Sequence, residues 1–303
     1  MSERIAIIGA GLMGHGLALV FAQGGHEVWL TDAQPEALAS LHQRIGETLR
    51  SLGQTTDCLR RVHTVSLLED AVAKADIVVE AAPEKLELKQ ELFERIETAA
   101  RADCIFASNT SVIPISKVMA KVKNRSRAVG THWWNPPYLV PLVEVIQTAD
   151  TDASLIARMM VLLTKLGKVP VHVKKDVPGF VGNRLQHALW REAISLIENG
   201  VCDAETVDLV VKNSFGRRLA VLGPIENADL VGTDLTLDIH NQVLADLEDS
   251  NTPSPYLRDL VRNGKLGFKT NEGFRSWNEE KKSSVRKSVN DHLTLLNQIL
   301  EKS

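Results

Sequence analysis

A histidine and a glutamate twelve residues apart are well suited to move a proton. His132 follows the apolar run Ala128–Thr131, and Glu144 lies within the run Leu142–Ile146. Imidazole titrates near working pH, so His132 could take a proton from a hydroxyl while Glu144 fixed its tautomer and stabilised the imidazolium. A short Pro-rich turn joins the two strands that these runs predict, so the side chains could meet. A hydrogen-bonded structural histidine is the alternative that the residues alone leave open.

A glycine-rich segment near the N-terminus predicts a dinucleotide site. Residues 9–14 read GAGLMG, which fits GxGxxG and lies between an apolar run and a helical pattern. Gly9 allows a tight turn, Gly11 leaves room for pyrophosphate and Gly14 lets the helix pack closely. The helix N-terminus offers N–H groups to phosphates. An ordinary glycine turn is the alternative explanation of the motif.

The choice between the two nicotinamide cofactors depends on the end of the second strand. Asp32 lies there, about twenty residues beyond the glycines. A carboxylate at this position accepts hydrogen bonds from ribose hydroxyls and repels a 2′-phosphate. No arginine follows Asp32 to neutralise it, so the pattern predicts NAD rather than NADP.

An α/β domain is expected to position these side chains. Short runs rich in Val and Ile alternate with longer helical patterns, which is typical of parallel strands joined by crossover helices. The first half of the chain therefore predicts a Rossmann-type, doubly wound, mostly parallel sheet. Strands are expected at Arg4–Ile8, Glu27–Thr31, Ile77–Glu80, Ile105–Ser108, Ala128–Thr131, Leu142–Ile146 and Val169–Lys174.

The chain from Pro178 onward predicts an all-α domain. The junction near Asp176–Gly179 separates an NAD-binding domain, residues 1–177, from a helical substrate and dimerisation domain, residues 178–303. The apolar stripe of the last helix is explained either by docking on its own domain or by packing against a second subunit. Helices are expected at Gly182–Asn199, Asp203–Lys212, residues 229–248, residues 254–263 and Glu279–Lys302.

Composition and charge argue against several other classes of protein. The 303 residues are 44% hydrophobic and 24% charged, as in a globular protein of two domains. The net charge of -3 is interleaved along the chain and predicts no nucleic-acid partner. Cys58, Cys104 and Cys202 lie far apart, which argues against disulfides and a metal site. The first residues show no leader or membrane segment, so we expect a cytoplasmic protein with no membrane partner.

Polar patches are expected just beyond the carboxyl ends of strands, where doubly wound sheets bind ligands. They read EAAPEK at residues 80–85, SNTS at 108–111 and HWWNPP at 132–137, with Glu144 on the next strand. Together with GAGLMG, Lys89, DVPGFVGNR at 176–184 and GKLGFKTNEGF at 264–274, these patches resemble the L-3-hydroxyacyl-CoA dehydrogenase family. The resemblance runs along nearly the whole chain.

The resemblance implies an NAD-dependent oxidoreductase acting on a CH–OH group, with His132 and Glu144 as the catalytic pair. It also implies that Ser111 and Asn183 contact the reacting oxygen, which fits the ability of a hydroxyl and an amide to stabilise alkoxide charge. A homodimer built through the helical domain is a further implication. Motif and resemblance together predict cofactor contacts at Gly9, Gly11, Leu12, Met13, Gly14, Asp32, Glu84, Lys89, Asn109, Asn135 and Lys269.

The substrate is less clearly indicated. The interval between Asp32 and EAAPEK is shorter and less basic than in the mitochondrial members, where a basic helical excursion helps to hold CoA. NPPYLVPLVE at 135–144 and GRRL at 216–219 are more similar to the L-gulonate 3-dehydrogenase (lambda-crystallin) branch, which uses free hydroxy acids. Arg217 or Arg218 could bind a substrate carboxylate, or both could be solvated at a helix end. We therefore favour oxidation of a small 3-hydroxy acid to its 3-oxo product over oxidation of a 3-hydroxyacyl-CoA.

Other features keep alternatives open. Trp133 and Trp134 could line a pocket for a flat or cationic substrate, such as carnitine or a pyridine carboxylate, or one of them could pack at the domain interface. Oxidation of a hydrated aldehyde would use His132 in the same way, on a gem-diol. A covalent route through Cys104 is disfavoured because this residue begins a strand, away from the ligand edge. A non-enzymatic role has a precedent in lambda-crystallin, but it is disfavoured here because His132, Glu144, Ser111 and Asn183 are all present.

Overall fold

The computed structural model describes residues 2–300, and the chain divides into two compact units. The sheet unit comprises Met1–Arg184 with Leu293–Ser303, and the helical unit comprises Leu185–His292. No helix within residues 2–300 is both long enough and apolar enough to cross a membrane.

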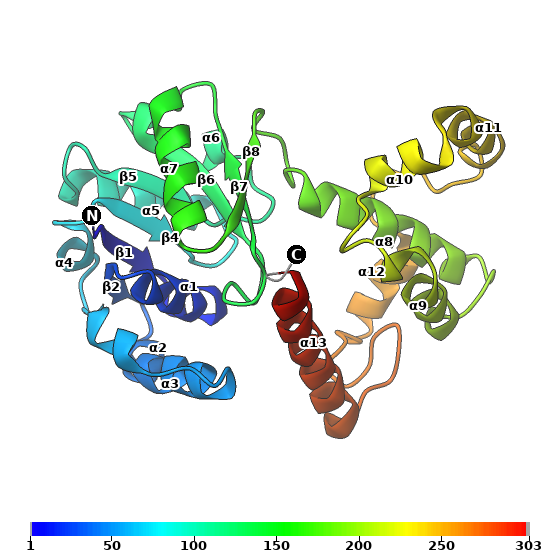
Figure 1. The fold of residues 1–303 in the computed structure, drawn as a ribbon, viewed down its shortest axis with the longest axis horizontal. Helices are drawn as coiled ribbons and strands as arrows, with labels where there is room; N and C mark the ends of the chain where they lie inside the picture. Colours follow the sequence, from blue (N-terminus) through cyan, green and yellow to red (C-terminus); the bar gives the residue numbers. More distant parts are fainter. Residues whose placement is uncertain (1, 301–303) are drawn as a thin grey trace. The chain divides into compact units, whose positions relative to one another are not determined.

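The sheet unit is built on one eight-stranded sheet in the order β3-β2-β1-β4-β5-β6-β7-β8 (Figure 1). Neighbouring strands are parallel except for β6 and β7, which pair antiparallel. The fold is therefore the expected doubly wound, mostly parallel sheet. The strands are β1 (Arg4–Ile8), β2 (Glu27–Thr31), β3 (Val62–Thr64), β4 (Ile77–Glu80), β5 (Ile105–Ser108), β6 (Ala128–Trp133), β7 (Leu142–Ile146) and β8 (Val169–Val173).

Two apolar clusters cover the two faces of this sheet because successive strand residues point to opposite faces. Ile5 and Ile7 pack with α1, α3 and α7, whereas Ala6 and Ile8 pack with α4, α5 and α6. The bounds of the helices are α1 (Leu12–Gln23), α2 (Pro35–Ala39), α3 (Leu41–Ser51), α4 (Leu68–Val72), α5 (Leu86–Ala99), α6 (Ile115–Val118) and α7 (Ala153–Lys165), with 3₁₀ helices η1 (Asp57–Arg61) and η2 (Arg125–Arg127).

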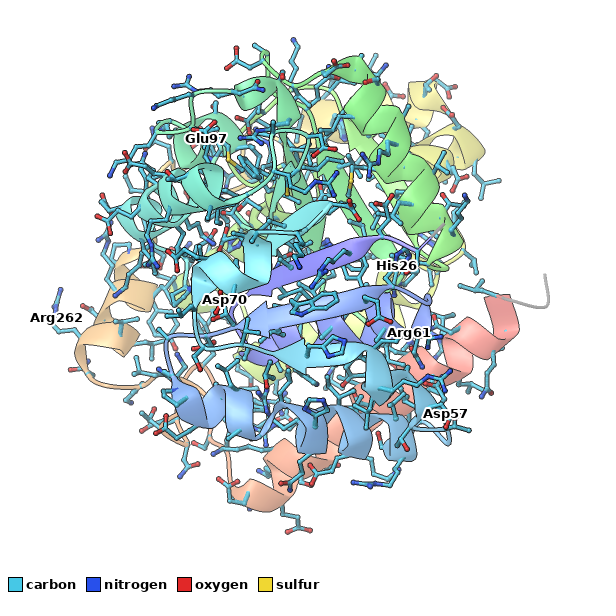
Figure 2. The ribbon with its side chains drawn as sticks, turned by 90° about the vertical axis from the view of Figure 1, so that its left-hand side faces the viewer. His26, Asp57, Arg61, Asp70, Glu97 and Arg262 are labelled. Carbon is cyan, nitrogen blue, oxygen red and sulfur yellow. The ribbon has the colours of Figure 1, made fainter. Side chains whose placement is uncertain are left out.

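Three strand predictions need correction. The edge strand β3 was missed because it has three residues and Val62 alone is apolar and buried. Asp57 and Arg61 in Figure 2 mark η1, which leads directly into it. Strand β6 runs two residues further than expected, through Trp133, because it pairs with β7 up to that point. Strand β8 ends at Val173, one residue early.

The helical unit contains only helices and isolated bridges within residues 185–292, as the sequence predicts. The helix expected at 229–248 is two helices, because Gly232 takes a φ of +101° between them. Only Leu260 and Lys282 are buried in this range, all of which is described. The helices are α8 (Gly182–Glu198), α9 (Ala204–Asn213), η3 (Phe215–Arg217), α10 (Pro224–Val231), α11 (Thr233–Val243), α12 (Pro255–Arg262) and α13 (Glu279–Leu300).

Candidate active site

The glycine-rich segment forms a tight loop between β1 and α1. Gly9 has a φ of +113°, and a Cβ on it would lie 2.7 Å from the carbonyl oxygen of Ala81. A Cβ on Gly14 would lie 1.8 Å from the carbonyl oxygen of Gly9, so both positions require glycine. Gly11 faces open space, and α1 begins after it without a side-chain cap on its first N–H groups. This cradle fits the pyrophosphate of a dinucleotide.

Asp32 lies beside the glycine loop, as its spacing predicts. Its Oδ2 accepts the N–H of Ala10 at 2.5 Å and its Oδ1 accepts the N–H of Gln34 at 2.8 Å. A carboxylate has about four acceptor positions, so capacity remains for ribose hydroxyls. Arg44 of α3, which no motif indicates, also holds this loop: its Nη2 donates to the carbonyl oxygens of Ala10 and Ala37 at 2.7 and 2.8 Å. The loop and Asp32 together fit NAD.

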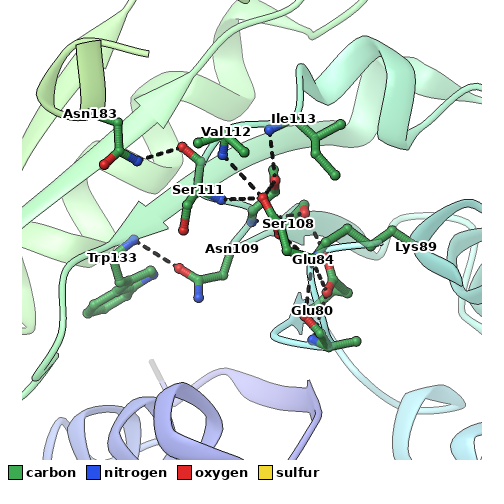
Figure 3. Close-up of polar contacts among 12 residues, drawn as sticks. Glu80, Glu84, Lys89, Ser108, Asn109, Ser111, Val112, Ile113, Trp133 and Asn183 are labelled. Carbon is green, nitrogen blue, oxygen red and sulfur yellow. Dashed lines mark hydrogen bonds and ion pairs between the residues drawn. The ribbon is translucent and has the colours of Figure 1, made fainter. Parts of the chain in front are cut away.

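A buried carboxylate lies at the end of β4. Glu80 is fully buried, and its Oε1 accepts Lys89 Nζ at 2.6 Å and the N–H of Ala82 at 2.7 Å. Its Oε2 accepts the hydroxyl of Ser108 at 2.7 Å (Figure 3). Lys89 is 1% exposed, and its ammonium also contacts the carbonyl of Ala82 and the carboxylate of Glu84. The predicted direct contact of Lys89 with the cofactor does not fit this burial, because its donors are used inside the protein.

Glu84 organises the loop that follows β5. Its Oε1 accepts the hydroxyl of Thr110 and the N–H groups of Ser111 and Val112 (Figure 3). These donors, with the Lys89 ammonium, outweigh the desolvation that opposes them and lower the pKa of Glu84. Glu84 is partly exposed, so a contact with cofactor stays a prediction. Its observed contacts position Ser111.

The structure brings His132 and Glu144 into direct contact. The antiparallel register of β6 and β7 places these two residues opposite each other. His132 Nδ1 lies 2.7 Å from Glu144 Oε2, and both side chains are at most 5% exposed. An ionised carboxylate only accepts hydrogen bonds, so Nδ1 carries the proton that joins them. Nε2 of His132 has no hydrogen-bond partner within residues 2–300 and is therefore the basic nitrogen.

The second oxygen of Glu144 is held by the start of α8. Glu144 Oε1 accepts the N–H groups of Val181 and Gly182 at 2.9 and 3.1 Å. Burial opposes ionisation, but the hydrogen bond from His132 and these two N–H groups lower the pKa of Glu144. The carboxylate is thus held ionised despite its burial. These donors could not be predicted from the sequence, because every residue except proline has a backbone N–H group.

The two tryptophans after His132 differ in their surroundings. Trp133 is 2% exposed and packs in the core, with its ring 5.7 Å from that of Phe21. The prediction that Trp133 lines a substrate pocket is therefore wrong, because successive residues of β6 point to opposite faces. Trp134 is half-buried, and its ring lies 5.3 Å from that of His132. Nε1 of each tryptophan is buried without a hydrogen-bond partner among the described residues.

Ser111 and Asn183 lie together, although 72 residues separate them. Asn183 Nδ2 donates to the carbonyl oxygen of Ser111 at 2.8 Å, as Figure 3 shows. The hydroxyl of Ser111 has no hydrogen-bond partner in the described part of the chain, so it remains available to a ligand. Asn109 Oδ1 accepts the N–H of Trp133 at 2.9 Å, which ties this loop to the end of β6.

A lysine side chain holds the loop between His132 and Glu144 by hydrogen bonds to its backbone. Lys168 is half-buried between α7 and β8, and its Nζ donates to the carbonyl oxygens of Pro137 at 2.5 Å and Val140 at 3.4 Å. It forms no ion pair among the described residues, and burial lowers its pKa from 10.5 to about 8. Asn135, a predicted cofactor contact, is exposed at the start of this loop.

Three predicted site residues belong to the helical unit. Arg217 and Arg218 lie at the end of η3, and Lys269 follows α12; all three side chains are exposed. Their proposed contacts with substrate and cofactor stay predictions. The covalent alternative finds no support in Cys104, because this thiol is fully buried and burial raises its pKa to about 12.

A glycine cradle, an acidic residue on the next strand and a buried histidine–carboxylate pair define a nucleotide-dependent dehydrogenase of the doubly wound class. Residues 4–177 match the NAD-binding domain of 3-hydroxyacyl-CoA dehydrogenase, and residues 179–277 match its C-terminal domain. The chain belongs to the 3-hydroxyacyl-CoA dehydrogenase family. It is an NAD-dependent dehydrogenase of the kind that acts on CH–OH groups.

Relatives with several activities resemble the chain. It is 35% identical to 5-formyl-3-hydroxy-2-methylpyridine 4-carboxylate 5-dehydrogenase of Mesorhizobium japonicum, over 99% of both chains. It is 38% identical to L-carnitine dehydrogenase of Streptomyces coelicolor, over 76% of this chain and 74% of the relative. A crystal structure of the first kind of enzyme, described as an NAD⁺-dependent dismutase, matches with a TM-score of 0.92 and 35% identity over 99% of both chains. The predicted likeness to the L-gulonate 3-dehydrogenase branch stays a prediction.

Proposed function

We propose that this enzyme oxidises a small free carboxylate at a carbon bearing a hydroxyl, with His132 and Glu144 as its catalytic pair. The observation that carries the proposal is the contact of 2.7 Å between His132 Nδ1 and Glu144 Oε2. It leaves Nε2 of His132 as the nitrogen that takes the substrate's hydroxyl proton. Glu144, held ionised by two backbone N–H groups, then stabilises the imidazolium.

Ser111 and Asn183 are proposed to bind the reacting oxygen. The hydroxyl of Ser111 is available to donate, and Asn183 is fixed beside it by the bond from its amide nitrogen to the Ser111 carbonyl. Donors placed where negative charge develops on oxygen lower the barrier of such reactions. The cradle of Gly9, Gly11 and Gly14, with Asp32, would hold NAD, which supplies the hydride acceptor when bound.

Trp134 is proposed to contact the substrate. Its half-buried ring lies 5.3 Å from that of His132, so a substrate that meets His132 would also meet this ring. A carboxylate substrate also agrees with the name of the Mesorhizobium relative, which acts on a pyridine carboxylate and matches over 99% of both chains.

A substrate screen with a catalytic variant tests the proposal. The purified enzyme would be given L-carnitine and other small hydroxy carboxylates with NAD⁺, and acetoacetyl-CoA with NADH. We expect turnover of a free carboxylate, no fast oxidation of NADH by acetoacetyl-CoA, and loss of most of kcat in His132→Gln with NADH binding retained. Fast turnover of acetoacetyl-CoA would restore the CoA thioester as substrate, and near-normal turnover by His132→Gln would refute the catalytic pair.

Oxidation of an aldehyde is the second candidate. The relative from Mesorhizobium is named for a substrate with a formyl group, which is an aldehyde. The matching crystal structure is described as that of an NAD⁺-dependent dismutase. A hydrated aldehyde has two hydroxyls on one carbon, so His132 would take one hydroxyl proton while the C–H bond gives up hydride, leaving the acid. Formation of acid from the pyridine aldehyde by this enzyme would establish this candidate.

We also propose that the enzyme is a homodimer through its helical unit. Leu260 is the only buried hydrophobic residue within residues 185–292, although apolar side chains recur along these helices. Val221, Ile225 and Leu230 are each more than 70% exposed. Apolar surface on this scale marks a protein interface. Sedimentation velocity should give twice the monomer mass of 33.4 kDa, and a monomer at micromolar concentration would refute the dimer.

A further inference from the structure

A short turn between β8 and α8 contacts Glu144, His132 and the loop that carries Ser111. We call residues 179–182 the left-handed turn. The N–H of Gly179 donates to the carbonyl of Val112, beside Ser111, at 3.1 Å. The N–H groups of Val181 and Gly182 donate to Glu144, as described above. The turn therefore meets the Ser111 loop on one side and the acid–base pair on the other.

The backbone of this turn is strained at Phe180. Gly179 and Phe180 have φ values of +74° and +51°. Among the non-glycine residues within 2–300, only Phe180 and Asn271 have positive φ. Asparagine adopts this region readily, whereas a bulky aromatic residue rarely does. Such strain persists only where the surroundings enforce it, and it is concentrated at functional sites.

The consequence of the strained backbone is a binding site for a carboxylate. After the two left-handed residues, the N–H groups of Val181 and Gly182 both donate to one carboxylate, as successive N–H groups of a turn can do for an anion. Here the anion is the side chain of Glu144. A right-handed conformation at Phe180 would change the path of the chain and aim the N–H groups of Val181 and Gly182 elsewhere.

The side chain of Phe180 contacts the other half of the pair. It is 1% exposed, and its ring lies 5.8 Å from the imidazole of His132 at an interplanar angle of 49°. Trp134 also contacts this imidazole, at 5.3 Å and 51°. Two aromatic rings and Glu144 thus limit the orientations that the His132 ring can adopt.

We propose that Phe180 is a positioning residue, whose left-handed backbone aims two N–H groups at Glu144 and whose ring fixes the imidazole of His132. The inference rests on the proposed role of the His132–Glu144 pair. Phe180 touches neither substrate nor cofactor in this scheme and acts only through these two residues.

Phe180→Ala and Phe180→Gly test whether the left-handed backbone at position 180 aims the two N–H groups at Glu144. Both variants lack the ring, so their difference reports the backbone alone. Alanine at an ordinary position is more stable than glycine, but at positive φ the order reverses. We expect the glycine variant to keep the turn and the alanine variant to lose it.

The readout is the carboxyl ¹³C NMR signal of Glu144 in the full-length enzyme, followed against pH and assigned by its absence in Glu144→Gln. His132 is the titratable group in hydrogen-bond contact with Glu144. Loss of two N–H donors disfavours the ionised form, so Phe180→Ala should raise the pKa of Glu144 by about one unit or more, tenfold in proton affinity. Phe180→Gly should stay closer to wild type. Equal titrations of Glu144 in wild type, Phe180→Ala and Phe180→Gly would overturn the proposal.

Phe180→Leu and Phe93→Leu test whether the ring of Phe180 fixes the imidazole of His132. They also replace the first test if Phe180→Ala does not fold. Phe93 is fully buried in the same apolar cluster, on α5, so both substitutions cost packing of a similar kind. We expect only Phe180→Leu to shift the low-field proton signal shared by His132 and Glu144. The same spectrum in both variants would overturn the contribution of the ring. This readout needs no substrate, so it remains valid if the substrate screen or His132→Gln refutes the proposed function.

Discussion

The sheet unit holds two buried carboxylates that are built in similar ways. Glu80 at the end of β4 and Glu144 on β7 are each at most 1% exposed, and each accepts three hydrogen bonds. Each has a basic side chain as one of its partners, Lys89 for Glu80 and His132 for Glu144. This construction supplies the donors that a buried carboxylate requires.

The two sites differ in whether the basic side chain keeps a hydrogen-bonding atom that has no partner in the described chain. The ammonium of Lys89 contacts Glu80, Glu84 and the carbonyl of Ala82, so its donors are used. His132 uses Nδ1 on Glu144, and its other ring nitrogen has no partner in the described chain. The first pair is closed and supports the fold. The second is open, as the proposed proton transfer requires.

The largest expected effect comes from Glu144→Gln. An amide in place of the carboxylate would present its NH₂ group to Nδ1 and favour the wrong tautomer of His132. We expect kcat to fall by about 10³ to 10⁴-fold, the size known for amide replacement of the carboxylate behind a catalytic histidine. Steady-state kinetics on the substrate from the screen measures this, with thermal unfolding as the control. A fall of less than tenfold would remove the distinction between open and closed pairs.

The next effect is on stability rather than on rate. Lys89→Met leaves Glu80 as an uncompensated buried charge, so we expect the free energy of unfolding to fall by about 3–5 kcal/mol. Urea unfolding measures it, and Lys85→Met, at an exposed position on the same segment, is the matched control. A loss below about 1 kcal/mol in Lys89→Met would show that the closed pair does not support the fold.

Lys168 sharpens the comparison because it is a half-buried cation without a carboxylate partner in residues 2–300. Burial lowers its pKa to about 8 from 10.5, so between these pH values the unfolded chain binds more protons than the folded one. Stability therefore rises with pH across this window, by at most about 3 kcal/mol. Subtracting the unfolding free energy of Lys168→Met at pH 7.5 and 9.5 isolates the contribution. A difference that stays constant or falls with pH would contradict it.

The parts of the site that could be predicted from the sequence are those that depend on particular residue types at a known spacing. Gly9, Gly14 and Asp32 follow a known spacing around a strand and a helix, and the structure places them as expected. His132 and Glu144 could be paired because a short turn joins two predicted strands. Each of these predictions depends only on residues and elements that are neighbours along the chain.

The missed parts depend on long-range packing or on backbone. Glu80 ends an otherwise apolar buried strand, which signals a counter-charge, but nothing in the spacing identifies Lys89 as its partner. Lys168 binds carbonyl groups, which every residue has, so its role leaves no trace in the sequence. Trp133 was misplaced because the end of β6 was set two residues early, which hid the alternation of its side chains.

The reversal of strand direction between β6 and β7 has a consequence for how such enzymes diversify. Pairing of the two strands keeps His132 opposite Glu144, whatever the loop between them contains. Substitutions at positions 135–141 can therefore change this loop without moving His132 away from Glu144. A slip of the strands by one residue would break the contact, since it would send Glu144 to the opposite face. The loop and the paired strands are in this way separate targets for mutation on one hairpin.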